Sequence, residues 1–264
     1  MTDPSASIGL VIRHGRDDDP VADAVVRAIA SPLLAAGMRF VTRSVTDEEA
    51  ELGTYRLWAR AGGIAGVVLL GVGEQDARIR LLRQIEMPFV ALAPASIEVD
   101  YPAVTVDATA ASTALTAFLD THHSSRCVYV TGQQHPEPFG GDAVAGDRAI
   151  EVVQTDDVVG ESVRIGVSAS EDAPLTLVLD SDHDADLILG ALEERGVRVP
   201  EAVALICWSD SLVCQSASRP ITAIDRRGRE IGTELGLAAI AAIHGEPFGS
   251  VAAPAPVVVI RETT

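Results

Sequence analysis

Short apolar runs alternate along the chain with longer amphipathic stretches. The apolar runs are typical of strands buried in a parallel sheet. They predict strands at Ile8–Ile12, Arg39–Arg43, Gly66–Leu70, Phe89–Leu92, Ala103–Val106, Cys127–Thr131, Leu175–Leu179, Ala202–Ile206 and Val257–Arg261. The amphipathic stretches predict helices at Pro20–Ala36, Glu48–Ala61, Ala77–Ile85, Ala110–His122, Ala185–Arg195 and Gly228–His244. This alternation indicates βαβ units built around a parallel sheet.

The order of these units indicates two lobes. A chain of 264 residues is longer than one compact core usually holds. A second series of strand–helix units begins after His122, so we expect a lobe boundary near Ser124. Residues 132–170 are less regular, because they are rich in Gly, Asp, Glu and Ser and show only a weak helical pattern around Arg148–Thr155.

Composition limits the partners of the chain. Hydrophobic residues make up 47% and aromatic residues only 4%, so the core is built from Ala, Val, Leu and Ile. The formal net charge is -18, and such a surface repels the phosphate backbone of nucleic acids. We therefore expect no DNA binding by this chain alone. There is also no basic stretch that anionic membranes would attract.

The cysteines and the N-terminus indicate a cytoplasmic protein. The three cysteines Cys127, Cys207 and Cys214 form no CxxC or Cys/His metal spacing, and so sparse a set fits a reducing compartment. The first seven residues lack the basic and apolar regions of a signal peptide. No apolar run approaches the roughly 18 residues that a membrane-spanning helix requires.

Short sequence patterns occur in a definite order along both halves of the chain. The letters given in parentheses are the consensus pattern that each segment resembles. In the first half the segments are Ile8–Ile12, Gly62–Leu69 (vDGiil, with Ala65 in place of Asp), Met87–Val90 (iPvV) and Val104–Asp107 before an Ala-rich helix. In the second half they are Ser181–Ala185 (nDxxA), Gly196 with Val199–Glu201 (G..vPeD), Ala204–Asp210 (svvGfDd), Pro220–Ile224 (p.lTTv), Ile231–Gly232 (mG) and Val258–Thr264 (lvvReSt). The ordered set resembles the regulatory core of the LacI/GalR family of transcription regulators, which shares the periplasmic sugar-binding fold.

The resemblance implies an α/β fold of two Rossmann-like lobes with parallel sheets, joined by three crossing strands, as in type I periplasmic-binding proteins. The crossings are expected near Ser124, Ile224 and Pro254. The implied N-terminal lobe comprises residues 8–123 and 225–253, and the implied C-terminal lobe comprises residues 124–224 and 254–264. Residues 1–7 are expected to be a disordered linker.

The resemblance also implies a function. The family binds a small effector in the cleft between its lobes, forms side-by-side homodimers and contacts DNA through a headpiece that precedes the first strand. Only seven residues precede Ile8, so the headpiece is expected to lie outside this sequence. A stand-alone solute-binding protein of the same fold is the alternative, although the sequence has no signal peptide to support it. We expect no enzyme, because the sequence shows no nucleophile with a matching base.

Candidate ligand-binding residues follow the strands, since ligands of open α/β sheets bind at the carboxyl ends of the strands. These positions are Arg13, His14, Gly71, Asp107, Ser181, Asp182, Trp208, Ser209 and Arg226. Arg148 joins them as the candidate for the arginine that holds the ligand in the family. We expect no cofactor and no metal, because Asp180–Asp186 lacks the Gly and Glu of a calcium loop.

Each candidate also has an alternative structural interpretation. Arg13 and His14 can belong to a solvated loop, and Asp107 and Asp182 can be helix N-caps. Trp208 can be a stacking wall or a core residue, and Arg226 can form a surface ion pair instead of reaching a ligand.

Departures from the family pattern affect the expected effector. Ser209 occupies the position of the family's ligand-binding Asp, and Arg13 to Arg16 replace an aromatic pair that stacks on sugar. Sugar sites combine apolar ring faces with planar hydrogen-bond partners. We therefore expect neutral monosaccharides to bind weakly and an anionic effector to fit better. The effector class is a sugar, a sugar derivative or another polar metabolite.

Overall fold

The computed structural model describes residues 6–13, 20–122, 126–132, 144–145, 148–180 and 182–264. The chain divides into two compact units. Unit 1 comprises residues 1–108 and 227–254, and unit 2 comprises residues 109–226 and 255–264. The chain therefore passes between the units three times. Each unit is described by itself below.

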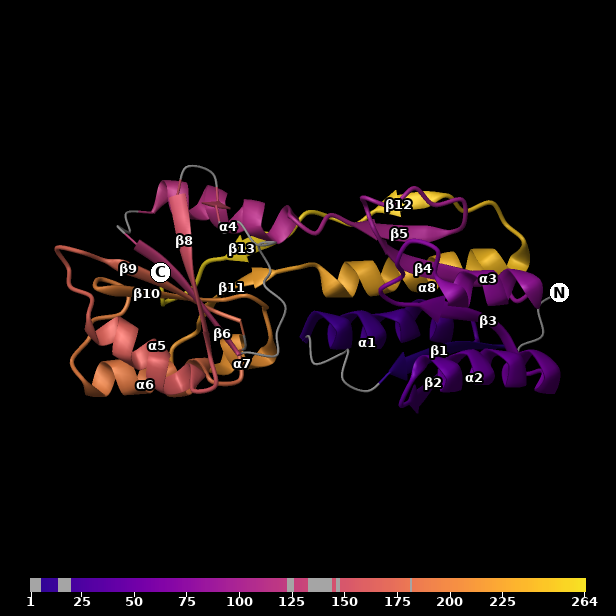
Figure 1. Ribbon diagram of the computed structural model, residues 1–264, viewed down its shortest axis with the longest axis horizontal. Helices are drawn as coiled ribbons and strands as arrows, with labels where there is room; N and C mark the ends of the chain where they lie inside the picture. The colour runs from indigo at the N-terminus through magenta and orange to yellow at the C-terminus, as the bar shows by residue number, and fades with distance from the viewer. Residues whose placement is uncertain (1–5, 14–19, 123–125, 133–143, 146–147, 181) are drawn as a thin grey trace. The chain divides into compact units, whose positions relative to one another are not determined.

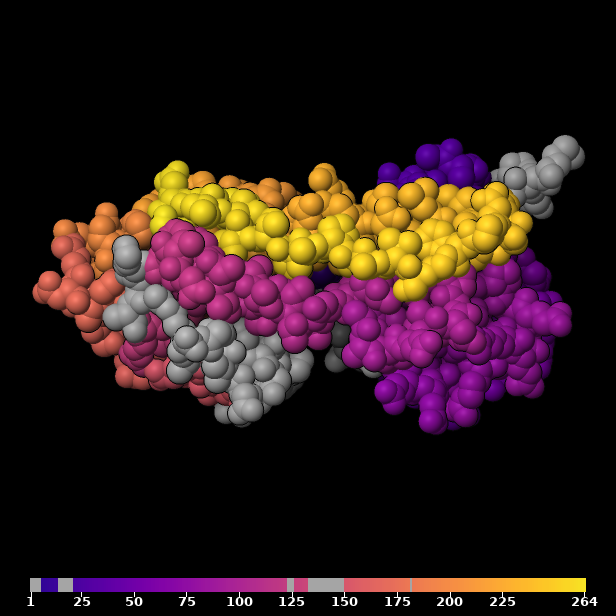
Figure 2. Space-filling model, turned by 90° about the horizontal axis from the view of Figure 1, so that it is seen from above, coloured from indigo at the N-terminus to yellow at the C-terminus, as the bar shows by residue number. Residues whose placement is uncertain are grey.

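Unit 1 is built on a sheet of six parallel strands in the order β12-β5-β4-β3-β1-β2 (Figure 1). The strands are β1 (Ser7–Arg13), β2 (Arg39–Val45), β3 (Ile64–Leu69), β4 (Phe89–Pro94), β5 (Ala103–Val106) and β12 (Ser250–Ala252). Among the described strands, β2 and β12 lie at the two edges of this sheet. Figure 2 looks onto the second of these edges, where the yellow segment around β12 lies beside the magenta β5.

Helices cover both faces of the unit 1 sheet. They are α1 (Pro20–Ala35), α2 (Glu48–Ala61), α3 (Ala77–Gln84) and α8 (Gly228–His244). One hydrophobic cluster joins the strands to α2 and α3 through Tyr55, Trp58 and Leu82. A second cluster joins them to α1 and α8 through Ile29 and Leu235, so the sheet lies between two apolar layers.

Local sequence determines where these helices begin and end. Asp47 caps α2, because its Oδ1 accepts a hydrogen bond of 2.9 Å from the amide of Ala50. Three acidic residues in the first turn of α2 also favour the positive end of the helix dipole. Gly245 ends α8 with φ +67, a left-handed conformation that glycine adopts without steric cost.

Unit 2 is built on a seven-stranded sheet in the order β13-β11-β10-β9-β6-β8-β7. The strands are β6 (Arg126–Gly132), β7 (Val144–Ala145), β8 (Arg148–Thr155), β9 (Leu175–Leu179), β10 (Val203–Cys207), β11 (Thr222–Asp225) and β13 (Val257–Val259). The five central strands run parallel, whereas β13 and β7 at the edges pair antiparallel with β11 and β8.

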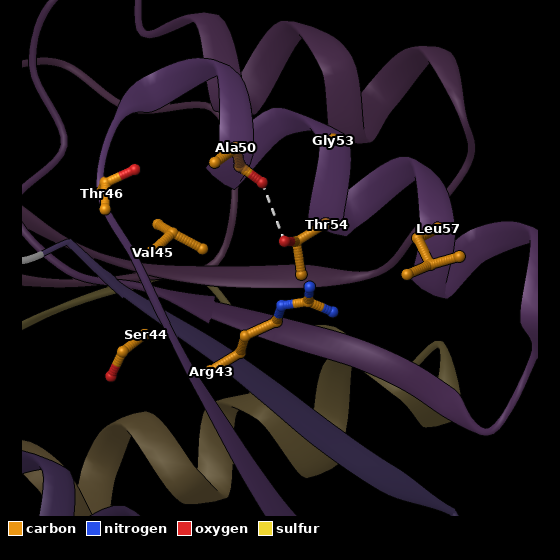
Figure 3. A pocket seen from close by; sticks show the side chains of 8 residues that line it. All are labelled: Arg43, Ser44, Val45, Thr46, Ala50, Gly53, Thr54 and Leu57. Carbon is orange, nitrogen blue, oxygen red and sulfur yellow. Dashed lines mark hydrogen bonds between the residues drawn. The ribbon is translucent and has the colours of Figure 1, made fainter.

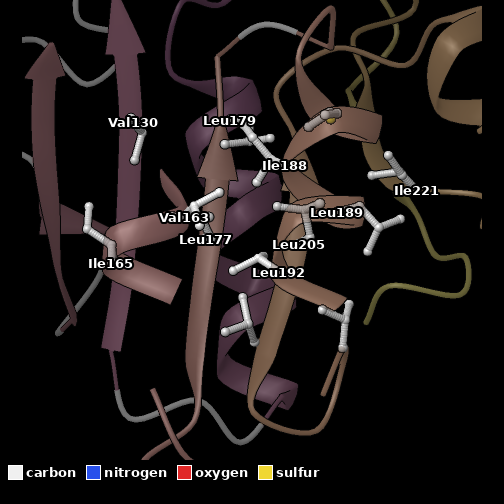
Figure 4. Close-up of a cluster of buried hydrophobic side chains, with 14 of the residues drawn as sticks. Val130, Val163, Ile165, Leu177, Leu179, Ile188, Leu189, Leu192, Leu205 and Ile221 are labelled. Atoms are coloured by element: carbon white, nitrogen blue, oxygen red, sulfur yellow. The ribbon is translucent and has the colours of Figure 1, made fainter. Parts of the chain in front are cut away.

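Helices again cover both faces of the unit 2 sheet. They are α4 (Ala110–Thr121), α5 (Val158–Val167), α6 (Ala185–Glu194) and α7 (Leu212–Ser216). Figure 4 shows one apolar cluster, in which Leu177 and Leu205 of the strands pack against Val163 of α5 and Leu189 of α6. On the other face α4 contributes Leu115 and Leu119 to a cluster with Tyr129 and Ile206 of the strands.

The two-unit α/β architecture with mostly parallel sheets confirms the fold class expected from the sequence. The first division falls between Ala108 and Thr109, whereas we expected it near Ser124. The reason is packing, because the apolar face of α4 lies on the strands of unit 2. Of the expected linker at residues 1–7, residues 1–5 lie outside the described residues, and Ser7 is already part of β1.

The irregular segment differs from its predicted structure. Residues 148–155, where the sequence shows a weak helical pattern, form the strand β8. Ile150 and Val152 pack on one face of the sheet and Val153 packs on the other, so β-branched side chains fill both faces. The predictions also missed helices α5 and α7 and strands β7, β11 and β12.

Candidate functional site

Polar side chains gather at the carboxyl edge of the unit 2 sheet. Strands β6, β9, β10 and β11 are parallel neighbours, so the segments that follow them lie along one edge. Those segments supply Asp180 and Asp182 after β9, Ser209 and Asp210 after β10, and Arg226 after β11. This edge is where open α/β sheets bind ligands.

Asp180 is fixed by two hydroxyl groups of the neighbouring strand. Tyr129 donates a hydrogen bond of 2.5 Å to Oδ1 of Asp180, and Thr131 donates one of 2.9 Å to Oδ2. Both donors lie in β6, and Thr131 is fully buried. The carboxylate after β9 is therefore held in one orientation at the edge of the sheet.

Two arginines hold the segment that follows β10. Arg226 donates a hydrogen bond of 2.7 Å to Oγ of Ser209, which is 1% exposed. Arg261 donates one of 2.8 Å to Oδ2 of Asp210 and another of 2.7 Å to the carbonyl of Ile221. The other carboxylate oxygen of Asp210, Oδ1, is buried and accepts no hydrogen bond from the described residues.

The structure places Trp208 in the core. Its side chain is 5% exposed and packs edge-to-face on Tyr129, with ring centroids 5.6 Å apart. It belongs to the cluster that α4 covers, so of its two interpretations the core residue is the one observed.

Asp182 is buried, at 8% exposure, but it is not the N-cap of α6, because that position belongs to Asp184. Cys207 and Cys214 lie near Asp182, and both are fully buried in the apolar cluster of which Figure 4 shows a part. The hydrogen bond with Cys214 and burial raise the pKa of Cys207, so this thiol stays protonated.

In unit 1 the expected ligand contact Arg13 belongs to a network of charges. Its Nε lies 3.1 Å from Oε2 of Glu51, and its Nη1 lies 3.7 Å from Glu48. Glu51 is 1% exposed, and its Oε1 accepts hydrogen bonds from Tyr55 at 2.8 Å and from Arg78 at 3.3 Å. Arg13 therefore lies in β1 and pairs with Glu51 and Glu48, so the solvated-loop interpretation is not the one observed.

Arg78 is the centre of this network. It is 6% exposed, binds Asp76 through Nη2 at 2.7 Å and donates to the carbonyls of Leu70 and Gly71 at 3.1 Å each. Burial disfavours its charged form, but the hydrogen bonds and the negative charges of Asp76 and Glu51 outweigh burial and raise its pKa. Burial and the charge of Glu51 together raise the pKa of Tyr55.

The remaining candidates have different places. Gly71 follows β3 with φ +57, and its carbonyl is bound by Arg78. Asp107 is exposed, and the N-cap of α4 is Thr109 rather than Asp107. Arg148 lies in β8, where its backbone pairs with Ala145 of β7. His14 and Ser181 lie outside the described residues.

The sequence alone missed five functional candidates: Asp180, Asp210, Arg261, Glu51 and Arg78. Asp180 directly follows the predicted strand Leu175–Leu179, and Asp210 directly follows the candidate Ser209, so the same rule could have included them. Glu51 and Arg78 lie 27 residues apart in separate helices, and nothing in either helix marks them as partners. Within the described part of the chain there is no group of three or more His, Cys, Asp or Glu able to hold a metal ion.

Several solved structures share the fold of this chain. A LacI family transcriptional regulator from Bifidobacterium animalis subsp. lactis DSM 10140 is similar, with 24% identity, a TM-score of 0.79 and coverage of 100% of this chain and 98% of that chain. A periplasmic binding protein/LacI transcriptional regulator from Alkaliphilus metalliredigens QYMF, complexed with D-xylulofuranose, has 16% identity, a TM-score of 0.68 and 98% coverage of both chains. The transcriptional regulator CelR in complex with cellobiose has 20% identity, a TM-score of 0.67 and coverage of 98% and 84%.

These similarities extend over the whole chain, and at such identities they establish the fold. No curated protein matches the chain. None of the described helices is both long and apolar enough to span a membrane. The sequence model of the periplasmic binding protein-like domain matches residues 132–264, just over half of the chain. The chain belongs to the periplasmic binding protein-like domain family.

Proposed function

We propose that this chain is the effector-binding and dimerising part of a LacI-type transcription regulator. The similar structures are regulators with this fold, and two of them hold a sugar. The observation that carries the proposal is the buried Oδ1 of Asp210, which accepts no hydrogen bond from the described residues. A buried carboxylate oxygen without a donor is costly, so a ligand hydroxyl there would be favourable.

The described side chains favour a hydroxylated ligand without a formal negative charge. The expectation of an anionic effector rested on Arg13 and Arg16. Arg13 is paired with two carboxylates, and Arg16 lies outside the described residues. At the unit 2 edge Asp180, Asp182 and Asp210 outnumber Arg226 and Arg261, which makes the edge a set of acceptors for hydroxyl groups.

A thermal-shift panel tests the ligand class. It contains neutral mono- and disaccharides, their phosphates, and nucleosides. A ligand at 100 times its dissociation constant adds about 2.7 kcal/mol of stability, so a binder raises the Tm by several degrees. We expect at least one neutral sugar to shift the Tm more than its phosphate does. A shift with phosphorylated members alone would restore the anionic effector and contradict the hydroxylated one.

Substitution of Asp210 tests the site. Asp210→Asn removes the charge from the carboxylate, and a hydrogen bond to a charged group contributes about 1.5–3 kcal/mol. We therefore expect the affinity for the panel's best ligand to fall about tenfold or more, as measured by titration calorimetry. Asp172→Asn is the matched control, since Asp172 is exposed before β9, at the opposite edge of the same sheet. Equal affinities of both variants would place the ligand elsewhere.

Dimerisation is the second part of the proposal. Neighbouring helices α6 and α7 expose Leu187 at 63% and Leu212 at 79%. Contiguous exposed apolar surface marks interaction sites, and we place the interface where these two helices contact each other. We expect the chain to sediment as a dimer at micromolar concentration and Leu212→Asp to sediment as a monomer. Leu34→Asp in α1, where Leu34 is 65% exposed, is the control and should leave the dimer intact.

A stand-alone binding protein of the same fold is the other candidate, because the family takes its name from such proteins. The two functions differ in one measurable feature of the complete gene product. A helix-turn-helix domain encoded in frame before residue 1 supports the regulator. A secretion signal in that place supports the binding protein.

A further inference from the structure

Two of the three cysteines lie beside each other, next to the proposed ligand site in unit 2. Cys207 ends β10 and Cys214 lies in α7, so the segment 208–213 separates them. That segment contains Ser209 and Asp210. Both cysteines are free thiols, and both are fully buried in the cluster that joins the sheet to α5 and α6.

Hydrogen bonds connect the two thiols to the backbone of this segment. The thiol of Cys207 bonds to the sulfur of Cys214. The thiol of Cys214 donates in turn to the carbonyl oxygen of Ser209, with 3.6 Å between sulfur and oxygen. The backbone of Cys214 is also held, because its amide donates a hydrogen bond of 3.4 Å to Oγ of Ser211 at the start of α7. The two sulfur atoms are therefore neighbours within one small network.

The two thiols differ in acidity. The hydrogen bond from Cys207 lowers the pKa of Cys214, and hydrogen bonds with Ser211 lower it further, although burial acts in the opposite direction. The same pair interaction and burial raise the pKa of Cys207. The thiolate is the nucleophilic form of cysteine. Cys214 is therefore the thiol that reacts first, and Cys207 is its protonated partner.

The element that covers Cys214 is small. α7 has only five residues, and two of them, Leu212 and Val213, are exposed at 79% and 38%. Such short surface elements open locally at a lower free energy than the whole fold. A peroxide is a small molecule, so opening of this single turn admits it to Cys214. Cys127 differs, because it lies in β6, which has a paired strand on each side.

We propose that Cys207 and Cys214 form a reversible disulfide when a peroxide oxidises the chain, and that this bond alters the segment between them. The sulfur of Cys214 attacks one peroxide oxygen, the O–O bond breaks, and the leaving hydroxide takes the proton of Cys214 to form water. The sulfur of Cys207 then attacks the sulfenic acid on Cys214, the S–O bond breaks, and the hydroxide leaves as water with the proton of Cys207. Both sulfur atoms are oxidised, and the peroxide is reduced. A dithiol reductant restores both thiols by exchange.

The disulfide changes the ligand site through Ser209, and this part of the inference rests on the proposed function. After oxidation Cys214 has no S–H group, so the carbonyl oxygen of Ser209 loses a hydrogen bond. The sulfur atoms also approach to about 2 Å, which draws α7 toward the end of β10. We therefore expect Ser209 and Asp210 to shift and the affinity of the site to fall.

Peptide mapping tests the disulfide without any ligand. The reduced chain is treated with millimolar hydrogen peroxide, alkylated with iodoacetamide and digested with trypsin. The peptide 199–226 contains both Cys207 and Cys214, and the peptide 127–148 contains Cys127. We expect the first peptide to be unalkylated and lighter by two hydrogen atoms, and the second to be alkylated. Alkylation of both cysteines in the first peptide, or addition of oxygen without loss of hydrogen, would overturn the proposal.

Single variants test the order of the two steps. Cys207→Ser removes the second thiol and should stop the reaction at the sulfenic acid of Cys214, which dimedone labels. Cys214→Ser should leave Cys207 as an unlabelled thiol. Dimedone labelling of Cys214→Ser in place of Cys207→Ser would reverse the two roles and contradict the mechanism. Circular dichroism and the Tm show that each variant is folded.

A groove in unit 1 between α2 and β2 supplies a matched control for a buried thiol. Its volume is about 410 Å³, and Thr54 on its helix wall donates a hydrogen bond of 2.8 Å to the carbonyl of Ala50, the dashed line in Figure 3. Thr54→Cys in the Cys207→Ser, Cys214→Ser chain places a buried thiol beside a carbonyl, in a unit whose sequence has no other cysteine. Its tryptic peptide should lose no hydrogen with peroxide. Such a loss would show that a neighbouring thiol is not required.

Two further measurements separate this inference from the proposed ligand class. Hydrogen exchange of residues 208–213 should slow in the oxidised chain and recover with dithiothreitol, with no ligand present. The affinity for the best ligand of the panel should fall at least threefold on oxidation, and Cys207→Ser with Cys214→Ser should not respond to peroxide. A disulfide that leaves hydrogen exchange unchanged contradicts an altered segment. If no member of the panel binds, the proposed ligand class is wrong, and hydrogen exchange still decides about the disulfide.

Discussion

Single residues show how charge is stabilised inside unit 1. Glu51 and Arg78 are almost fully buried. Oε1 of Glu51 accepts hydrogen bonds from Tyr55 and Arg78, Arg78 also binds Asp76, and Oε2 of Glu51 forms an ion pair with Arg13. Removing one partner from such a group leaves an uncompensated charge, which is far more costly than losing a surface ion pair. Arg13 joins the same group at its exposed margin, and this explains why a residue expected to meet a ligand meets Glu51 instead.

Acid should weaken this network. Burial raises the pKa of Asp76, but hydrogen bonds and the charge of Arg78 outweigh burial, so the pKa of Asp76 lies below its ordinary value. A carboxyl whose folded pKa is lowered contributes its stability above the unfolded pKa of about 4 and loses it as the pH falls through the folded value. In urea unfolding we expect Asp76→Asn to be less stable than the wild type at pH 7, and this difference to shrink at pH 3.

The exposed Asp172 provides the control, since it forms no ion pair with the described residues. The Asp172→Asn variant should match the wild type closely at both pH values. If the gap between Asp76→Asn and the wild type is unchanged at pH 3, the charge of Asp76 does not stabilise the fold.

The rule that placed candidates at strand ends brings some of these residues together in the structure and not others. It located Ser209 and Arg226, which the structure joins by a hydrogen bond. It could not show that Trp208 turns into the core, because the direction of a side chain after a strand depends on tertiary packing. Asp107 and Asp182 each lie two residues before the N-cap of the next helix, a difference smaller than the error of boundaries read from sequence.

At the scale of elements, periodic segments were predictable and the irregular one was not. Helices α2 and α8 have the bounds expected from their amphipathic pattern. β8 was missed because apolar residues on both of its faces hide the two-residue alternation of a strand. α7 has five residues and is too short to show a helical period.

Two helix glycines give a paired prediction. In Gly232→Ala the new Cβ would approach the carbonyl oxygen of Val25 and the Cβ of Ala28, where α8 packs on α1. Overpacking costs roughly 1–3 kcal/mol, so we expect a net loss of stability despite the better helix propensity of alanine. In Gly53→Ala nothing is within 4 Å, and we expect a gain of about 0.5–1 kcal/mol. Urea unfolding measures both, and shifts of the same sign would contradict the prediction.

At the scale of the whole molecule, the ordered set of weak patterns predicted more than any single motif. The order of strands and helices indicated two α/β units, and the structure has them. The first boundary was misplaced because sequence order does not show which sheet covers α4. Neither could the sequence identify β2 as an edge strand, since an edge becomes evident only when the order of the sheet is known.

The net charge of -18 predicts that this chain alone does not retain DNA. Affinity for a duplex comes largely from Lys and Arg that displace counterions. Ten of the arginines in the described residues form ion pairs with acidic side chains. In a mobility-shift assay with a 30-base-pair duplex we expect no complex at micromolar protein, even at 50 mM salt. Arg39 and Arg43 on β2 and Arg56 and Arg60 on α2 are exposed, so they make this a stringent test. A complex that weakens steeply with salt and disappears in Arg39→Glu with Arg43→Glu would mean that the local charge of these arginines outweighs the net charge of the chain.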